Sequence, residues 1–197
     1  DQYNKQDKNK IFLTNLGNPQ HKLSWEKTYL LVNHLSSQIS KDIKLGDRCI
    51  LISENRPEWL ISDLAIMLAG GISVPSYTTY STKDYEYIIK DCEPSVLIVS
   101  NNIQFKKIKD ILDYKKIKKI ISFDRLENLK FQNYLCIEDI INKKDGLENF
   151  DSEVELKRSD PACIIYTSGT QGNPKGVILS HGGILSNCEG GYELLKS

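Results

Sequence analysis

Short apolar runs alternate with amphipathic segments along most of the chain. Residues 95–100 (SVLIVS) are apolar at successive central positions, which is typical of a strand buried on both faces. Segments between such runs place apolar residues three to four positions apart, as amphipathic helices do. The pattern predicts strands at 48–53, 72–75, 95–100, 117–123, 162–167 and 177–180. It predicts helices after Ser24, from Pro57 to a Gly70-Gly71 stop, from about Thr82 to before Pro94, over 103–114 and 137–143, and from about 180 onward.

Residues that start and stop helices support these boundaries. Pro57 suits a first helical turn, and Gly70-Gly71 suits a helix end. Ser81 and Asp84 have the spacing of a capping box. Strands and helices that alternate at short spacing imply right-handed crossovers, so we expect an α/β fold with mainly parallel sheets and flanking helices.

The pattern weakens between Leu126 and Asp160 and then returns. We therefore expect residues 1–159 to form a first α/β subdomain, incomplete at its start, and residues 160–197 to begin a second subdomain or a new sheet. The chain starts at Asp1 without an initiator Met or a signal segment, and it stops just after a helical pattern. We expect it to be cut at both ends.

Composition restricts the kind of function. The 197 residues carry 26 Lys+Arg against 26 Asp+Glu, so no overall charge attracts nucleic acid and any anion must be bound by a local site. The apolar content excludes a disordered chain. Five cysteines without C-x-x-C spacing indicate free thiols in a reducing compartment, and no apolar run is long enough for a bilayer, so we expect a cytoplasmic protein.

The segment that carries chemistry is Tyr166–Gly176, YTSGTQGNPKG. Glycines let backbone N–H groups converge on anionic oxygens, the hydroxyls add neutral donors, and Lys175 adds a positive charge. This combination is suited to holding a polyphosphate. The segment is not a Walker loop, because Gly176 follows Lys175 and Gly169 is only three positions from Gly172. It also lacks the dinucleotide and nucleophile-elbow patterns, and on residue types alone a plain hairpin turn remains an alternative.

The string YTSGTQGNPKGVILSH resembles the phosphate-binding signature of the adenylate-forming superfamily, which includes acyl-CoA synthetases, peptide-synthetase adenylation domains and luciferases. The segments 53–59 (SENRPEW), 63–65 and 70–75 (GGISVP) look like the amino-terminal half of long-chain fatty acyl-CoA synthetases in particular. The resemblance covers roughly residues 24–195. It implies the amino-terminal part of the large domain of an adenylate-forming enzyme.

The resemblance implies an ATP-dependent, AMP-forming acid–CoA ligase that uses ATP, Mg²⁺ and coenzyme A. A carboxylic acid, most simply a long-chain fatty acid, would be activated to acyl-AMP and then to acyl-CoA. The motif places these residues around the phosphates: Thr167, Ser168, Gly169, Thr170, Gln171, Gly172 and Lys175. Thr167 is the expected hydroxyl nearest the metal, and none of the residues is a general base or nucleophile.

The sequence also departs from the family pattern. Gln171 stands where relatives usually carry Thr or Ser, and the family's adenine loop, magnesium glutamate, ribose aspartate and terminal-domain lysine are missing. We therefore expect a fragment that is inactive alone. The alternatives are an adenylating enzyme for aryl, short-chain or amino acids, or a non-catalytic nucleotide-binding fragment. The expected partners are small molecules, with no nucleic acid, and peripheral membrane association would arise through a lipid substrate.

Several other residues have a structural and a functional interpretation. Trp25 and Trp59 are predicted to be core residues, because both lie on apolar helix faces. Tyr77 and Tyr80 follow a predicted strand and either pack a loop or line a groove. His181 is predicted to cap or pack a helix start.

Overall fold

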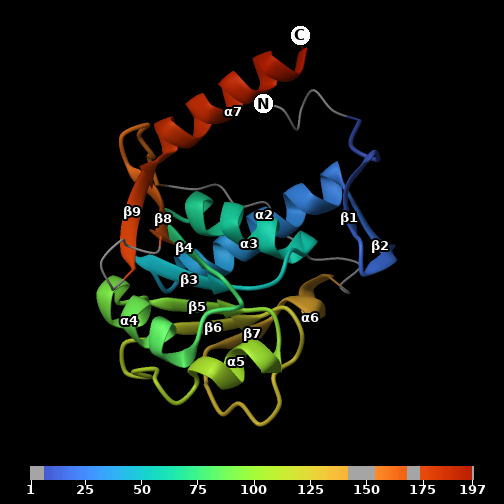
Figure 1. Ribbon diagram of the computed structural model, residues 1–197. Helices are drawn as coiled ribbons and strands as arrows, with labels where there is room; N and C mark the ends of the chain where they lie inside the picture. The colour runs from blue at the N-terminus through green and yellow to red at the C-terminus, as the bar shows by residue number, and fades with distance from the viewer. Residues whose placement is uncertain (1–6, 142–153, 168–173, 197) are drawn as a thin grey trace.

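The computed structural model describes residues 7–141, 154–167 and 174–196 and contains two sheets. A two-stranded antiparallel sheet is formed by β1 (Ile11–Asn15) and β2 (Asn18–Ser24). The second sheet has seven strands in the order β7-β6-β5-β3-β4-β8-β9 (Figure 1). Its strands are β3 (Arg48–Ile52), β4 (Ile72–Ser76), β5 (Val96–Val99), β6 (Lys119–Ser122), β7 (Tyr134–Cys136), β8 (Pro161–Thr167) and β9 (Lys175–Ser180).

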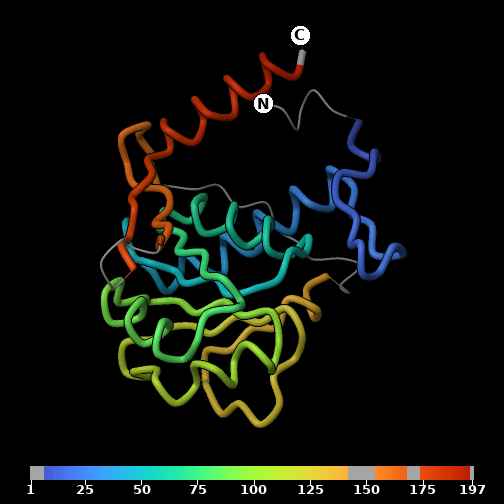
Figure 2. The backbone as a smooth tube through the Cα atoms, in the orientation of Figure 1, coloured from blue at the N-terminus to red at the C-terminus, as the bar shows by residue number. Residues whose placement is uncertain are grey.

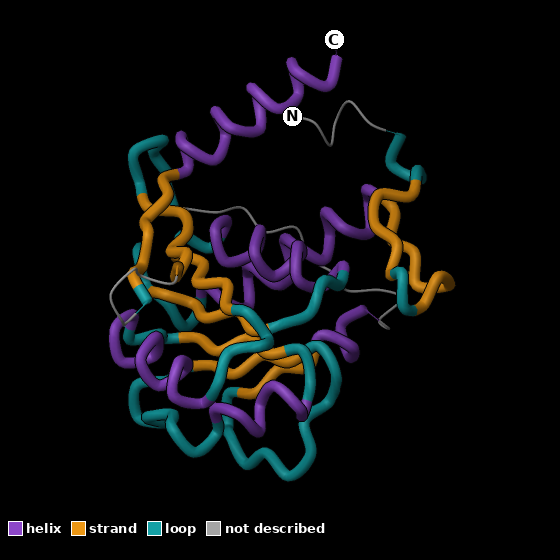
Figure 3. The backbone as a smooth tube through the Cα atoms, viewed as in Figure 1, coloured by secondary structure: helices purple, strands orange, loops and turns teal. Residues whose placement is uncertain are grey.

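Helices cover both faces of the seven-stranded sheet, as Figure 3 shows in purple on either side of the orange strands. The helices of the described ranges are α2 (Trp25–Ser40), α3 (Pro57–Leu68), α4 (Thr82–Cys92), α5 (Asn102–Ile108), α6 (Ile137–Ile141) and α7 (His181–Lys196), the last of which belongs to neither face. Helices α2, α3 and α6 pack on one face, and α4 and α5 pack on the other. Alternate strand residues separate the two cores, since Leu51 belongs to the first and Ile50 to the second.

The expected α/β fold with a mostly parallel sheet is therefore present. In the seven-stranded sheet, as far as its strands are described, every neighbouring pair from β7 through β8 is parallel and the pair β8–β9 is antiparallel. Ser81 and Asp84 form the predicted capping box at the start of α4, and Gly70 has a φ of +82° just after α3. Local signals thus fix several element ends as the sequence predicts.

Other expectations need correction. The helix expected over 103–114 ends at Ile108, and the rest of that segment forms turns in which the Tyr114 hydroxyl donates to the Lys109 carbonyl oxygen at 2.9 Å. The β1–β2 hairpin and strand β7 were not anticipated. No new sheet begins at 160, because β8 joins β4 in the same sheet. That junction has a single registered pair, Ser73 with Cys163, and the proposed subdomain boundary stays a prediction.

The carboxyl-terminal elements lie at one side of this layered body. Figure 2 shows the red α7 extending away from the sheet, while the blue β1–β2 hairpin lies beside α2. Val177 and Ile178 of β9 are 46% and 63% exposed. Within the described ranges, no helix has the length and apolar character that crossing a bilayer requires. The described ends of the predicted phosphate segment, Thr167 and Lys175, are exposed and belong to the β8–β9 edge of the sheet.

Candidate phosphate-binding hairpin

Thr167 and Lys175 are the last registered pair of the antiparallel ladder between β8 and β9. Directly opposed residues in such a ladder place their side chains on the same face, with Cβ atoms about 5 Å apart. Both residues are exposed. The fold therefore brings one hydroxyl and one ammonium group together at an accessible strand end.

The other predicted phosphate ligands are Ser168, Gly169, Thr170, Gln171 and Gly172, and they lie outside the described residues. Their sequence connects the two strands of the hairpin. The two strands correspond to the hairpin that residue types alone suggested, and they also correspond to the strand-to-loop setting of the phosphate motif. The described pair is compatible with both interpretations.

The end of β8 separates a buried face from an accessible one. Ile164 and Tyr166 pack against the core that contains α4, whereas Ile165 lines a groove on the opposite face. Because side chains alternate along a strand, Thr167 lies on the same face as Ile165. The candidate phosphate site and the groove therefore share one side of β8.

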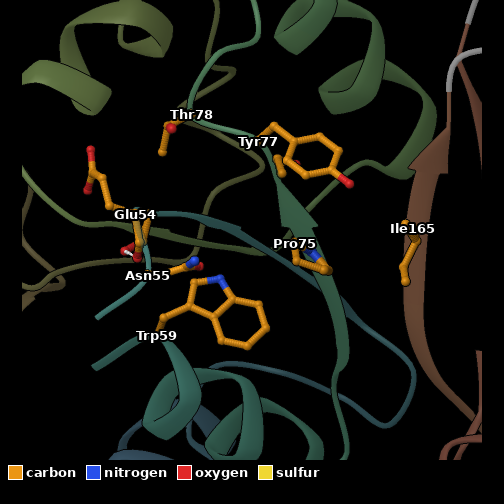
Figure 4. A pocket seen from close by; sticks show the side chains of 9 residues that line it. Glu54, Asn55, Trp59, Pro75, Tyr77, Thr78 and Ile165 are labelled. Carbon is orange, nitrogen blue, oxygen red and sulfur yellow. Dashed lines mark hydrogen bonds between the residues drawn. The ribbon is translucent and has the colours of Figure 1, made fainter. Parts of the chain in front are cut away.

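The groove has a volume of about 580 Å³ and lies at the carboxyl ends of β3 and β4 (Figure 4). Its walls are Ser53, Glu54, Asn55, Trp59, Pro75, Ser76, Tyr77, Thr78 and Ile165. Figure 4 shows the Trp59 ring on one side and the Tyr77 ring on the other. Ligands of open parallel sheets commonly bind outside the carboxyl ends of the strands. The groove is thus in a place where this architecture binds small molecules.

Three aromatic residues of this region, Trp59, Tyr77 and Tyr80, differ in what they contact. Trp59 was predicted to be a core residue, and it packs partly on the first core while also lining the groove. Tyr77 is 64% exposed and lines the groove, whereas Tyr80 packs against the second core. Helix periodicity alone missed the position of Trp59 because it cannot tell where a neighbouring strand ends.

The polar wall of the groove carries a fixed negative charge. Partial burial would raise the pKa of Glu54, but contacts with the Ser100 hydroxyl, with its own backbone and with Gln104 lower that pKa below its usual value. The Gln104 amide nitrogen donates to Glu54 Oε1 at 2.8 Å. The carboxylate is therefore ionised at neutral pH. Sequence reasoning gave no role to Glu54, since a single acidic residue after a strand is not a distinctive signal.

The described residues offer little to a metal ion by themselves. Within these ranges there is no cluster of three His, Cys, Asp or Glu side chains that could hold one. Mg²⁺ at nucleotide sites usually keeps several waters and binds through phosphates and one or two protein oxygens. The exposed Thr167 hydroxyl, opposite Lys175, could supply one such protein oxygen.

Comparison with known proteins places the chain in a family. The profile of the AMP-binding enzymes matches residues 1–196. The long-chain-fatty-acid–CoA ligase ACSBG1 of Rattus norvegicus is 30% identical over 168 residues, which are 83% of this chain and 23% of the rat protein. The long-chain-fatty-acid–CoA ligase ACSBG2 of Xenopus laevis is 31% identical over 176 residues, which are 85% and 23% of the two chains. The chain thus spans less than a quarter of these relatives.

Solved structures share the fold. Apo MatB from Rhodopseudomonas palustris superposes with a TM-score of 0.73 and 23% identity, over 94% of this chain and 34% of MatB. The anthranilate CoA ligase AuaEII, solved with anthranoyl-AMP, gives a TM-score of 0.70 and 24% identity, over 88% and 32% of the two chains. The profile match extends over nearly every residue, and it includes the hairpin with Thr167 and Lys175. The chain therefore belongs to the AMP-binding enzyme family.

Proposed function

We propose that the complete protein is an ATP-dependent, AMP-forming acid–CoA ligase and that its acid is a long-chain fatty acid. The observation that carries the proposal is the ladder end at which Thr167 faces Lys175, within a chain that matches the AMP-binding family from residue 1 to 196. The acid is inferred from the names of relatives that are about 30% identical. A cytoplasmic location remains part of the proposal.

The proposed reaction has two steps. A carboxylate oxygen of the acid attacks the α-phosphorus of ATP, the bond between the α-phosphorus and its bridging oxygen breaks, and pyrophosphate leaves. The sulfur of coenzyme A then attacks the acyl carbon of the acyl-adenylate, AMP leaves, and the thiol proton is released. The acid is its own nucleophile, so the hairpin needs to orient phosphates and balance charge rather than transfer a proton.

Each predicted ligand has a defined part in this proposal. Lys175 donates to the β- and γ-phosphates and offsets the negative charge that grows on departing pyrophosphate. The Thr167 hydroxyl would be the protein oxygen nearest a bound Mg²⁺, and Ser168, Gly169, Thr170, Gln171 and Gly172 would contribute the remaining phosphate donors. Bound Mg²⁺ would neutralise phosphate charge. Hydrogen bonds to charged oxygens contribute about 1.5–3 kcal/mol each, so a few of them can hold a triphosphate on an otherwise neutral protein.

Lys175→Ala in the complete protein tests the proposal most directly. We expect carboxylate-dependent ATP–pyrophosphate exchange to fall by about one to three powers of ten, because one preorganised charged donor is lost. Lys22→Ala is the matched control, since Lys22 is also an exposed strand lysine but lies on β2. Equal exchange rates in the two variants would refute the assignment of Lys175.

The acid is tested with a series of carboxylic acids of increasing chain length and with aryl and amino acids. The proposal expects the highest kcat/KM for long-chain fatty acids, and a preference for an aryl, short-chain or amino acid would replace that part of it. We also expect the isolated 197-residue chain to form no thioester. Acyl-CoA produced by that chain alone would contradict the view that further segments are needed.

A further inference from the structure

The first and last residues of the Tyr166–Gly176 motif are among those with no part in holding phosphate in the proposal above. Tyr166 and Gly176 form the registered pair next to Thr167 and Lys175. Tyr166 is 3% exposed, so its side chain points into the protein and away from any ligand at the hairpin end. These two residues therefore need a different explanation.

Gly176 leaves room for the Tyr166 ring. A Cβ atom built on Gly176 would lie 3.3 Å from Tyr166 Cζ and 2.9 Å from Cγ2 of Ile164. Both distances are shorter than ordinary carbon contacts, and the shorter one requires the neighbouring chain to move. The ring of Tyr166 thus crosses the ladder and rests on the backbone of the opposite strand.

The hydroxyl of Tyr166 ties this ring to α4. It donates to Asp91 Oδ2 at 2.5 Å, and Asp91 lies in the last turn of the helix. Burial and the bond to Asp91 both raise the pKa of Tyr166. The phenol therefore stays protonated at physiological pH and remains a donor to the carboxylate. A hydrogen bond to an ionised group is stronger than one between two neutral groups.

The backbone of Tyr166 is held by a second tyrosine. The Tyr80 hydroxyl donates to the Tyr166 carbonyl oxygen at 3.2 Å. That carbonyl belongs to the peptide group that Tyr166 shares with Thr167, so the bond restrains the plane from which Thr167 projects. Tyr80 is itself placed by edge contacts with Tyr77 and Tyr85, at ring-centroid distances of 5.4 Å and 5.9 Å.

We propose that Tyr166 is a positioning residue: held by Asp91 and Tyr80 and seated on Gly176, it fixes the directions in which Thr167 and Lys175 project. The inference rests on the proposed function, because it assigns Thr167 and Lys175 to the phosphates. The registered pairing of β8 with β4 is at Ser73 and Cys163, so Tyr166 and Thr167 lie three and four positions beyond it along β8. Side-chain bonds to α4 and from the segment after β4 add restraint at this end of the strand.

The test uses Tyr166→Phe in the complete protein, which removes one hydroxyl and keeps the ring. We expect kcat/KM for ATP in the exchange reaction to fall about tenfold, with KM for the acid unchanged, because small misplacements of binding groups are costly to rate. Asp91→Ala should give a similar loss, and the double variant should lose no more than either single variant. Such non-additivity is expected when both residues act through one bond.

Tyr134→Phe is the matched control. Its hydroxyl forms a hydrogen bond with Ser122 Oγ at 2.7 Å and accepts one from the Leu126 N–H at 2.9 Å, at the far edge of the same sheet. We expect it to lower the unfolding temperature as much as Tyr166→Phe while leaving the ATP parameters unchanged. Identical ATP kinetics in the two tyrosine variants would overturn the inference.

A readout without catalysis separates this inference from the proposed function. Amide hydrogen exchange along β9 should be faster in Tyr166→Phe than in Tyr134→Phe in the absence of ATP. If Lys175→Ala leaves pyrophosphate exchange intact, the proposed function fails even when β9 exchanges faster. If Lys175→Ala impairs exchange but Tyr166→Phe alters neither ATP kinetics nor β9, only the positioning role fails. Tyr80→Phe and Asp91→Ala keep the test available if Tyr166→Phe does not fold, since each removes one of the two bonds while leaving Tyr166 itself unchanged.

Discussion

The centre of the seven-stranded sheet and its β8–β9 edge are held in different ways. All four residues of β5 are fully buried, whereas four of the six residues of β9 are exposed. The centre is stabilised by apolar residues on both faces and by continuous parallel pairing with β3 and β6. At the edge, β8 lies against β4 on one side and the more exposed β9 on the other, and specific bonds of Tyr166 add to this packing.

This difference separates stability from chemistry. Buried apolar strands supply most of the free energy of folding, and many substitutions there would unfold the domain. The polar groups proposed to bind phosphates lie where residues contribute less to that free energy, as functional loops on a rigid scaffold commonly do. Substitutions at the edge should therefore change the free energy of unfolding little but reduce activity.

The largest expected effect compares one isoleucine from each region in the 197-residue chain. Ile98→Ala should reduce the free energy of unfolding by about 3–4 kcal/mol, since Ile98 is fully buried and the substitution leaves a cavity. Ile178→Ala should cost less than about 0.5 kcal/mol, because Ile178 is 63% exposed. Denaturant unfolding measures both values, and equal costs would remove the distinction between centre and edge.

A smaller effect is expected at the polar junction where β3 and β6 end. Arg56 donates to both Asp124 carboxylate oxygens, at 2.9 Å and 3.0 Å, and lies 3.3 Å from Oε2 of the buried Glu58. Arg56→Met should reduce stability by about 2–3 kcal/mol, because Glu58 loses its arginine partner. Arg56→Met combined with Glu58→Gln should recover part of that loss in the same unfolding measurement. A double variant less stable than Arg56→Met would mean that the pair itself, rather than the stranded charge, is stabilising.

The smallest effect concerns the seam between the two regions. Asp63 Oδ1 accepts a hydrogen bond from Ser73 Oγ at 2.5 Å, and Ser73 is the β4 residue paired with Cys163 of β8. Burial raises the pKa of Asp63 above 3.8, and the bond from Ser73 only partly opposes this. The folded state therefore binds the proton more tightly than the unfolded state, and this contribution is complete below about pH 3.8 and lost as pH rises through the folded pKa.

Asp63→Asn removes that titration. We expect it to raise the denaturant midpoint of unfolding at pH 7.5 relative to the unsubstituted chain. The difference between the two midpoints should become smaller as pH falls toward 4. Measurements of the denaturant midpoint at several pH values give the profile. The Asp47→Asn variant serves as a contrast, because the carboxylate of Asp47 accepts a bond from Lys118 Nζ at 2.9 Å and its pKa is lowered despite partial burial. Asp47→Asn should lower the unfolding midpoint at pH 7.5. If both substitutions changed the midpoint in the same direction across the pH range, the raised pKa assigned to Asp63 would be contradicted.

The sequence by itself determined the elements whose signals are local. The apolar run at 95–100, the capping box at Ser81 and Asp84, and the glycines after α3 each act through neighbours in the chain, and each is present as predicted. The Tyr166–Gly176 string also identifies the family without any tertiary information. Local conformational preferences and burial patterns need no knowledge of distant residues.

Only the tertiary structure decided which distant residues meet. It joined β8 to β4, added β7 and the β1–β2 hairpin, and brought Trp59 to a groove wall beside Ile165. It also paired Tyr166 with Asp91, which lies 75 positions earlier in the chain. Such contacts form only after loop closure and packing have fixed several elements at once, and their free energies depend on geometry that no local pattern encodes.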